Sequence, residues 1–247
     1  MKMNNVIDTL IKRKSVRVFL DQEIEEEKVE TILKASINAP TAGNQQLYTI
    51  LKITDSSIKQ QLSVLCDHQP FIASAKLLLV YLADCHKWYE AYKDIDLNPR
   101  QPELGDFLLA VDDALIASEN AVIAAQSLGI GSCYIGDVME NREEISKLLH
   151  LPDYVFPAAL LVFGYPTTQQ QKRQKPQRAN LKDIVFENSY HDMNAQEREA
   201  MLKYHYGDAE YKSWLETFYK RKYNSSFAHE MNRSVKAYLK QYEKKDG

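Results

Sequence analysis

The sequence feature that most constrains the fold is the stretch DFLLAVDDALIASENAVIAAQSLGIG, residues 106–131. Alanine, leucine, isoleucine and valine recur in it at helical spacing, which predicts one long helix that ends at Gly129. Only a narrow polar side is left, formed by Asp112, Asp113, Glu119 and Asn120. Because a helix that is apolar around most of its circumference cannot lie on a solvated surface, we expect it to be buried centrally or packed against another chain.

The rest of the first two thirds of the chain contains both helix-like and strand-like segments. Residues 4–14 and 25–39 carry apolar side chains at helical spacing. Strands are predicted at residues 47–54, 75–84, 131–137 and 156–166. The second and the last of these are almost continuously apolar, as expected for strands covered on both faces. Since strands and helices do not alternate in regular units, we expect an α+β sheet layered with helices and not a doubly wound fold.

Composition and charge exclude several classes of protein. Hydrophobic residues are 45% and charged residues 26% of the chain, which is typical of a globular protein. The pI of about 6.1 argues against a nucleic-acid binder. We expect neither a signal peptide nor a membrane span, because no apolar run is long enough. The 3 cysteines and the 6 histidines lack metal-ligand spacing, so we expect no metal site, reduced thiols and a cytoplasmic location.

The C-terminal part differs in composition from the rest. Residues 190–247 contain 8 of the 15 tyrosines. A polar linker, PTTQQQKRQKPQR at residues 166–178, precedes them. We therefore expect one ligand-binding domain at residues 1–190 and a helical extension at residues 191–247, packed on the same domain.

The first candidate site is a basic stretch, RKSVR at residues 13–17. Arg13, Lys14, Ser15 and Arg17 combine guanidinium, ammonium and hydroxyl donors, which are the groups that bind a phosphate monoester. The alternative is a solvated basic helix end, where cations offset the negative end of the helix dipole.

The second candidate site is the uncharged loop NAPTAGNQQLY, residues 38–48, between a predicted helix and a predicted strand. Its threonine, asparagine and glutamine side chains favour a ligand with hydroxyl or amide groups, and Gly43 permits close backbone approach. The alternative is a plain connecting loop. A dinucleotide-binding loop at Gly129 and Gly131 is excluded, because these glycines follow a helix and precede a strand.

Six segments in order resemble the nitroreductase family of flavin oxidoreductases, in particular its branch of NADPH-dependent flavin reductases and oxygen-insensitive nitroreductases. The segments are RKSVRVF, APTAGNQQ, HQPFIASAKLLLVYLAD, VDDALIASENAVIAAQSLGIGSCYIGD, VFPAALLVFGYP and VFENSYHD. The resemblance runs over residues 5–192. It implies an α+β nitroreductase-like fold, with a central, mostly antiparallel sheet flanked by helices and the long central helix at a dimer interface. It also implies an obligate homodimer that binds two FMN molecules in clefts between the subunits, within residues 1–190 of each chain.

The resemblance implies a set of residues that contact FMN. They are Arg13, Lys14, Ser15, Arg17, Pro40, Thr41, Ala42, Gly43, Asn44, Gln46, Gln69, Tyr134, Ile135, Gly136, Lys175 and Arg178. The basic stretch would hold the phosphate, the loop would reach the flavin from the other chain, and Gln69 would approach the ribityl or ring region. Backbone groups of residues 134–136 would line the ring. Lys175 would lie at its pyrimidine side and Arg178 near the phosphate, although a solvated linker stays an alternative for residues 172–178. Lys14, Asp137 and the inserted Gln177 depart from the family pattern.

The implied activity is an FMN-dependent, ping-pong, two-electron reduction of nitroaromatics, quinones or free flavin, with NADPH as co-substrate. The flavin N5 would perform the chemistry, so no catalytic side chain is predicted. For the 2′-phosphate of NADPH we select Lys220, Arg221 and Lys222, for which a solvated helix end is the alternative. Two other functions stay open: a flavin-storing or flavin-sensing protein with little turnover, and a dehalogenase or flavin-fragmenting reaction on the same fold.

Overall fold

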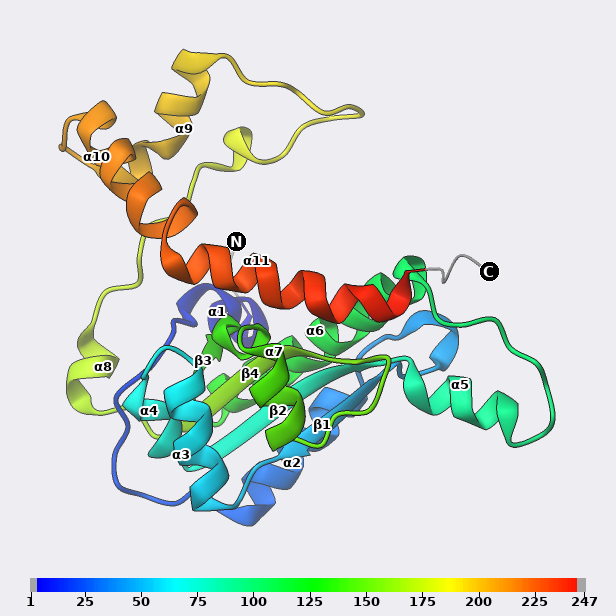
Figure 1. Cartoon of the computed structure of the whole chain (residues 1–247). Helices are drawn as coiled ribbons and strands as arrows, with labels where there is room; N and C mark the ends of the chain where they lie inside the picture. The colour runs from blue at the N-terminus through cyan, green and yellow to red at the C-terminus, as the bar shows by residue number, and fades with distance from the viewer. Residues whose placement is uncertain (1–3, 244–247) are drawn as a thin grey trace. The chain divides into compact units, whose positions relative to one another are not determined.

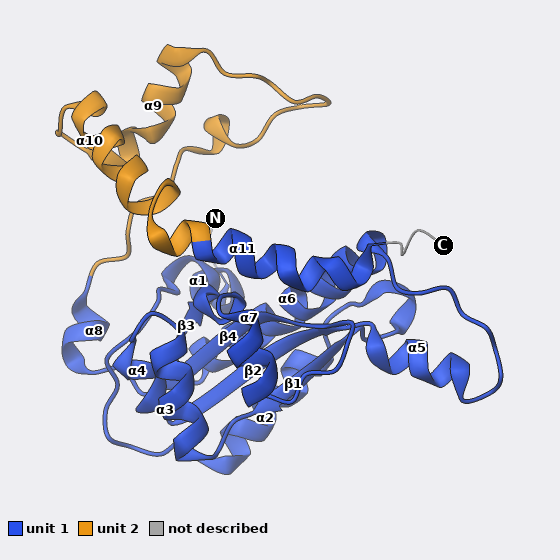
Figure 2. Cartoon of the chain, viewed as in Figure 1, with its two compact units in different colours: residues 1–173, 230–247 blue, residues 174–229 orange. Residues whose placement is uncertain are grey.

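The computed structural model describes residues 4–243 (Figure 1). Their contacts divide them into two compact units (Figure 2). The first unit contains the chain up to Arg173 and the segment from Glu230 onward, and the second unit is Gln174–His229. The predicted ranges, 1–190 and 191–247, extend at both ends beyond the described residues, and their division after residue 190 coincides with neither unit boundary.

The first unit is built on a four-stranded sheet with the strand order β1-β2-β4-β3. The strands are β1 (Tyr48–Lys52), β2 (Leu77–Asp84), β3 (Gly131–Ile135) and β4 (Val155–Gly164). Every pair of neighbours is antiparallel. All residues of β2 and β4 are buried, which confirms the prediction from their continuous apolar runs.

Helices cover both faces of this sheet. One face packs against α2 (Glu26–Ile37) and α6 (Leu104–Ser127). The other packs against α3 (Ser56–Leu65), α4 (Pro70–Ala73) and α7 (Arg142–Leu148), and Figure 1 shows α3 and α7 in front of the strands. Side chains of β2 alternate between the two cores: Leu79 and Tyr81 enter the first, Leu78 and Val80 the second. The α+β architecture predicted from the sequence is confirmed.

The long apolar helix predicted at residues 106–131 is α6. Its alanine-rich side is buried against α2 and the sheet, and its first turn is closed by a capping box between Glu103 and Asp106. A buried polar contact joins the three elements, because the Ser36 hydroxyl donates to the carbonyl of Ala117 at 2.8 Å and lies 3.0 Å from the Tyr81 hydroxyl. On the other side of α6, five large apolar residues are exposed: Leu104, Leu108, Leu109, Leu115 and Ile116.

The shorter elements were less visible in the sequence. Helix α1 (Asn5–Lys12) was predicted and is capped by the side chain of Asn4. Helices α3, α4, α7 and α5 (His86–Lys93) were not predicted, and neither was α8 (Thr168–Lys172). The latter lies inside the segment taken from its composition as a linker, and Thr167 caps it. Two 3₁₀ turns, η1 (Ala42–Asn44) and η2 (Gly136–Met139), flank β1 and β3.

The second unit is helical. It contains η3 (Leu181–Asp183), α9 (Ala195–Tyr206), α10 (Tyr211–Phe218), a π-helical turn (Tyr219–Tyr223) and the start of α11 (Ser226–Leu239). Helices α9 and α10 pack through aromatic rings, with the His205 ring 5.0 Å from those of Trp214 and Phe218. None of the described helices is both long enough and apolar enough to cross a membrane.

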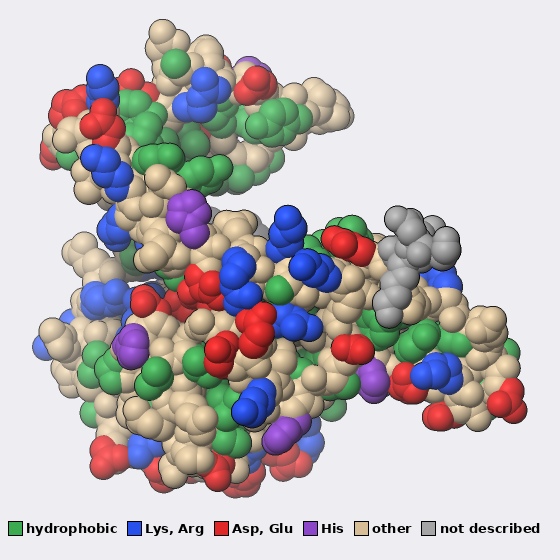
Figure 3. Space-filling model, in the orientation of Figure 1, with side chains coloured by type: hydrophobic (Ala, Val, Ile, Leu, Met, Phe, Trp, Pro, Cys, Tyr) green, Lys and Arg blue, Asp and Glu red, His purple; other side chains and the backbone are tan. Residues whose placement is uncertain are grey.

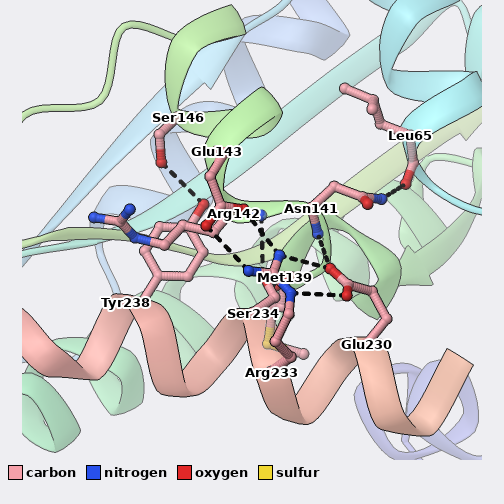
Figure 4. Close-up of polar contacts among 10 residues, drawn as sticks. All are labelled: Leu65, Met139, Asn141, Arg142, Glu143, Ser146, Glu230, Arg233, Ser234 and Tyr238. Carbon is pink, nitrogen blue, oxygen red and sulfur yellow. Dashed lines mark hydrogen bonds and ion pairs between the residues drawn. The ribbon is translucent and has the colours of Figure 1, made fainter.

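The remainder of α11 belongs to the first unit and is fixed to η2 and α7 (Figure 4). The Ser234 hydroxyl donates to the carbonyl of Met139 at 2.7 Å and accepts from the backbone of Arg142 at 3.0 Å. Arg233 donates to both Glu143 and Glu230. The Tyr238 hydroxyl accepts from Ser146, and the last turn, η5 (Lys240–Tyr242), buries Tyr242. Figure 3 shows acidic and basic side chains interspersed over this face of the first unit.

Glu140, between η2 and α7, makes the stability of the first unit depend on pH. It is 6% exposed, and its Oε1 has no hydrogen-bond partner among the described residues. Burial, followed by the charges of Asp137, Asp67 and Glu230, raises its pKa to about 7 from 4.5. The ionised form therefore destabilises the fold: the cost is absent below pH 4.5, grows as the pH rises from 4.5 to 7, and is complete above about pH 7.

We expect Glu140→Gln to raise the free energy of unfolding at pH 8 by up to about 3 kcal/mol and to change it little at pH 4.5. Urea denaturation at both pH values measures this difference. The exposed Glu144→Gln on α7 is the control and should show no such pH-dependent gain. Equal effects of Glu140→Gln at the two pH values would contradict the prediction.

Candidate active site

The basic stretch lies along the sheet edge formed by β3. Ser15 forms a parallel bridge with Ser132, and the backbone of Val16 donates to the carbonyl of Ser132 at 2.8 Å. The two segments approach so closely that a Cβ at Gly131 would lie 2.7 Å from Cγ2 of Val16. A glycine in β3 is therefore what allows the basic stretch to pair with the sheet at this point.

Within the basic stretch, Arg13, Ser15 and Arg17 gather around the side chains of β3. The guanidinium group of Arg13 lies over the ring of Tyr134, 5.7 Å from its centroid. Its Nε is buried and has no acceptor among the described residues. Burial raises the pKa of Cys133, and the charge of Arg17 opposes that rise. The arrangement brings two positive charges and the unpartnered Nε of Arg13 to one place, which suits an anionic ligand.

Lys14 points to a different part of the first unit. Its ammonium group donates to the carbonyl of Gln171 at 2.7 Å and to that of Arg173, at the C-terminal end of α8. The guanidinium group of Arg173 in turn donates to the carbonyl of Ser15. The sequence did not identify Arg173 as a site residue, because it lies in a segment that was predicted to be a linker. Its positive charge was the one sequence feature that could have indicated a role beside the basic stretch.

The loop at residues 40–46 is tightly folded and held by α6. Gly43, Asn44 and Gln46 have φ of 57°, 56° and 50°, in the left-handed region. Asp113, which is 3% exposed, accepts hydrogen bonds from the Thr41 hydroxyl and from the backbone of Ala42 (3.1 Å) and Leu47 (3.0 Å). From the sequence alone, Asp113 was identified only as part of the narrow polar side of the helix, and its contacts with the loop were not predicted.

The other implied contact residues of the first unit lie on η2, β3 and the start of α4. Gln69 precedes α4, and its side chain donates to the carbonyl of Cys66 at 2.8 Å. The Tyr134 hydroxyl lies 2.7 Å from Oγ of Ser118 and donates to Glu119 at 3.2 Å, both on α6. Ile135 is buried and Gly136 begins η2. Within one chain, the loop is thus bound to α6 at Asp113. The basic stretch pairs with β3, and β3 is bound to α6 at Ser118 through Tyr134.

The remaining predicted residues belong to the second unit. Arg178 donates to the carbonyls of Pro176 and Gln177, both at 3.4 Å. Lys220, Arg221 and Lys222 lie in the π-helical turn, where Arg221 covers the ring of Phe218 and Lys222 that of Phe227. Their roles, like that of Lys175, stay predictions.

Comparison with known proteins identifies the family. Residues 10–165 match the nitroreductase family model. The chain belongs to the nitroreductase family. It is 33% identical over 180 residues to the FMN reductase [NAD(P)H] of Bacillus subtilis, covering 72% of each chain. It is 30% identical over 192 residues to the oxygen-insensitive NADPH nitroreductase of Salmonella typhimurium, covering 78% of this chain and 77% of that one. Among solved structures, the NfrA1 nitroreductase from B. subtilis matches with a TM-score of 0.82 and 26% identity, over 95% of this chain and 98% of that one.

We expect Gly131→Ala to destabilise this nitroreductase by about 1–3 kcal/mol, because the added methyl group displaces Val16 and the basic stretch beside it. Thermal or urea denaturation measures the loss. Gly105→Ala is the matched control, since nothing lies within 4 Å of its Cβ and alanine is favoured in a helix. Equal stability of the two variants would show that the close approach at Gly131 is unimportant.

Proposed function

We propose that this nitroreductase-family protein is an FMN-dependent oxidoreductase that takes electrons from NAD(P)H, with NADPH as co-substrate, and reduces nitroaromatics, quinones or free flavin. The observation that carries the proposal is Arg13, whose buried Nε has no acceptor among the described residues. A phosphate oxygen would supply that acceptor. The names of its relatives, an FMN reductase and an NADPH nitroreductase, support the same reaction class.

The residues of the first unit fit FMN. Arg13, Ser15 and Arg17 would hold the phosphate. Lys14 donates to the carbonyls of Gln171 and Arg173, and Arg173 donates to the carbonyl of Ser15, so the stretch is tied to the end of α8. The loop and Gln69 offer amide and hydroxyl groups that suit the ribityl chain and the flavin ring. In the second unit, we propose Lys175 and Arg178 as further FMN contacts and Lys220, Arg221 and Lys222 as contacts of the NADPH phosphate.

The chain's own residues act by binding and orienting. Bound FMN would supply the two-electron transfer, and we propose ping-pong kinetics in which donor and acceptor use one site in turn. Burial raises the pKa of the Tyr134 hydroxyl, so this group stays protonated at neutral pH, and Ser118 and Glu119 hold it in place. Because bound FMN would supply the chemistry, we assign no catalytic side chain. The free, buried cysteines support a cytoplasmic location.

We propose that the enzyme is a homodimer whose second copy covers α6. Leu108 and Leu115 are 59% and 40% exposed, and helix α1 exposes a further set of apolar side chains: Val6, Ile7, Leu10 and Ile11. Monomeric proteins rarely leave so many large apolar side chains in water on neighbouring helices. In such a dimer the loop of one copy would complete the site of the other.

The purified protein should carry flavin absorption bands that NADPH bleaches in the absence of oxygen and that a quinone or nitroaromatic restores. A protein that stays colourless with added FMN would overturn the proposal. A yellow protein that does not consume NADPH would favour the flavin-storing alternative.

Neutralising the basic stretch tests the phosphate assignment. We expect Arg13→Gln combined with Arg17→Gln to weaken FMN binding about 10- to 100-fold, because charge-assisted hydrogen bonds to the phosphate are lost. Fluorescence titration of FMN measures the dissociation constant. Lys12→Gln is the control, since Lys12 is exposed and paired with Asp8 at 2.7 Å. Unchanged FMN affinity in the double variant would contradict the assignment.

The dimer is tested on α6. We expect Leu108→Glu combined with Leu115→Glu to give a folded monomer that binds FMN poorly, because the new charges would be buried in the interface. Sedimentation velocity measures the mass, and far-UV circular dichroism the fold. Leu181→Glu, at a residue that is 79% exposed, should stay dimeric. A wild-type monomer that binds FMN fully would refute the dimer.

A further inference from the structure

We infer that Asp113 is the positioning residue of the flavin-binding loop: its buried carboxylate on α6 holds residues 41–47 in the one shape that presents the loop to FMN. The inference rests on the proposed function, which makes the loop a flavin contact.

The hydrogen bonds of Asp113 reach both ends of the loop. Its Oδ1 accepts from the backbone of Ala42, and its Oδ2 accepts from the Thr41 hydroxyl and from the backbone of Leu47. The Oγ1 of Thr41 also accepts from the backbone of Gln46 at 2.8 Å. One side chain therefore closes the loop where it begins and where it ends.

The conformation that these bonds fix is unfavourable on its own. Gln46 lies in the left-handed region, which a glutamine keeps only where surrounding contacts impose it, whereas Gly43 and Asn44 adopt it more easily. Gly43, Asn44 and Gln46 are exposed, whereas Asp113, which binds both ends of the loop, is buried. This is the arrangement of a preorganised binding loop, in which the ordering cost is met before the ligand arrives.

Fixing the shape of a loop through a buried carboxylate carries a desolvation cost. Burial of an ionised carboxylate is unfavourable unless its oxygens are satisfied, and here three donors satisfy them. The charge of Asp113 affects the pKa of two neighbouring residues, Lys87 and Tyr48. Burial lowers the pKa of Lys87, and Asp84 and Asp113 oppose that change; burial raises the pKa of Tyr48, and Asp113 adds to it.

The position of Asp113 on α6 also connects the loop to the proposed dimer interface. Asp113 lies two residues before the exposed Leu115 on the same helix. Because a helix is rigid over such a distance, docking of a second copy on the leucine side sets the place of the loop relative to that copy. The loop would then reach the partner's flavin in a fixed position.

The test compares Asp113→Asn with Asp84→Asn. Asp84 is a matched control, because it is also buried and also accepts from a threonine hydroxyl, Thr49 at 2.6 Å, and from a backbone N–H, that of Lys87 at 3.2 Å. Among the described residues, the hydrogen-bond partners of the Asp84 side chain, Thr49 and Lys87, lie outside the loop. We expect Asp113→Asn to weaken FMN binding about tenfold or more and to change the visible circular dichroism of bound flavin, whereas Asp84→Asn changes neither.

Thr41 provides a second pair of variants if Asp113→Asn does not fold. Thr41→Val removes the hydroxyl that bridges Asp113 and Gln46 and should also weaken FMN binding, and Thr41→Ser should restore it. If Asp113→Asn and Asp84→Asn lose equal stability and both keep wild-type FMN affinity and dichroism, Asp113 is only structural and the inference is overturned. Wild-type affinity in a folded Thr41→Val would overturn it as well.

Hydrogen exchange separates this inference from the proposed function. The amides of Ala42 and Leu47 should exchange faster in Asp113→Asn than in wild type, with no flavin present. A wild-type protein that fails to bind FMN, with this difference intact, would refute the proposed function and leave Asp113 as the organiser of a loop with another ligand. Equal exchange in the two proteins would refute the inference itself.

Discussion

The close packing of α6 on the sheet is the interaction on which the rest of the structure depends. Ala110, Ala114, Ala117, Ala121 and Ala125 have no exposed surface, and they line the side of α6 that faces the first core. Their small side chains let the helix approach closely enough for the Ser36 hydroxyl to connect the Ala117 carbonyl with Tyr81. A larger side chain at these positions would force the helix away from the strands, because interiors packed at this density have no spare volume.

Both parts of the candidate site are attached to this one helix. The loop is held by Asp113, and β3, which carries the basic stretch along its edge, is joined to α6 by the Tyr134 hydroxyl. Segments that are far apart in the sequence thus share one rigid support. The exposed leucines of the same helix provide the surface on which we propose that a second copy docks. Cofactor binding and assembly would therefore depend on the same helix.

The C-terminal segment connects η2 and α7 with the first core, where Tyr242 contacts Phe107 of α6. Its ion pairs, between Arg233 and the partly exposed Glu143 and Glu230, contribute little by themselves because solvent screens them. The buried groups matter more: Ser234 satisfies backbone groups of Met139 and Arg142, and Tyr238 and Tyr242 extend the first core. Met139 and Arg142 lie in η2 and α7, which follow β3 in the chain. The contacts of α11 therefore stabilise the end of β3, the strand that we propose lines the flavin ring.

Local sequence patterns determined the helices at α1, α2 and α6 and all four strands, because periodicity and continuous apolar runs report directly on which side of an element is buried. They also determined the family and the chemical character of the basic stretch and the loop. Short helices such as α8 were missed, since a few polar residues after a capping threonine carry no apolar period. Only the tertiary structure decided that Asp113 is buried beneath the loop, that Lys14 turns toward α8 and that Arg173 returns to Ser15. The physical reason is that a charged side chain has the same sequence signature whether water or another segment of the chain satisfies it.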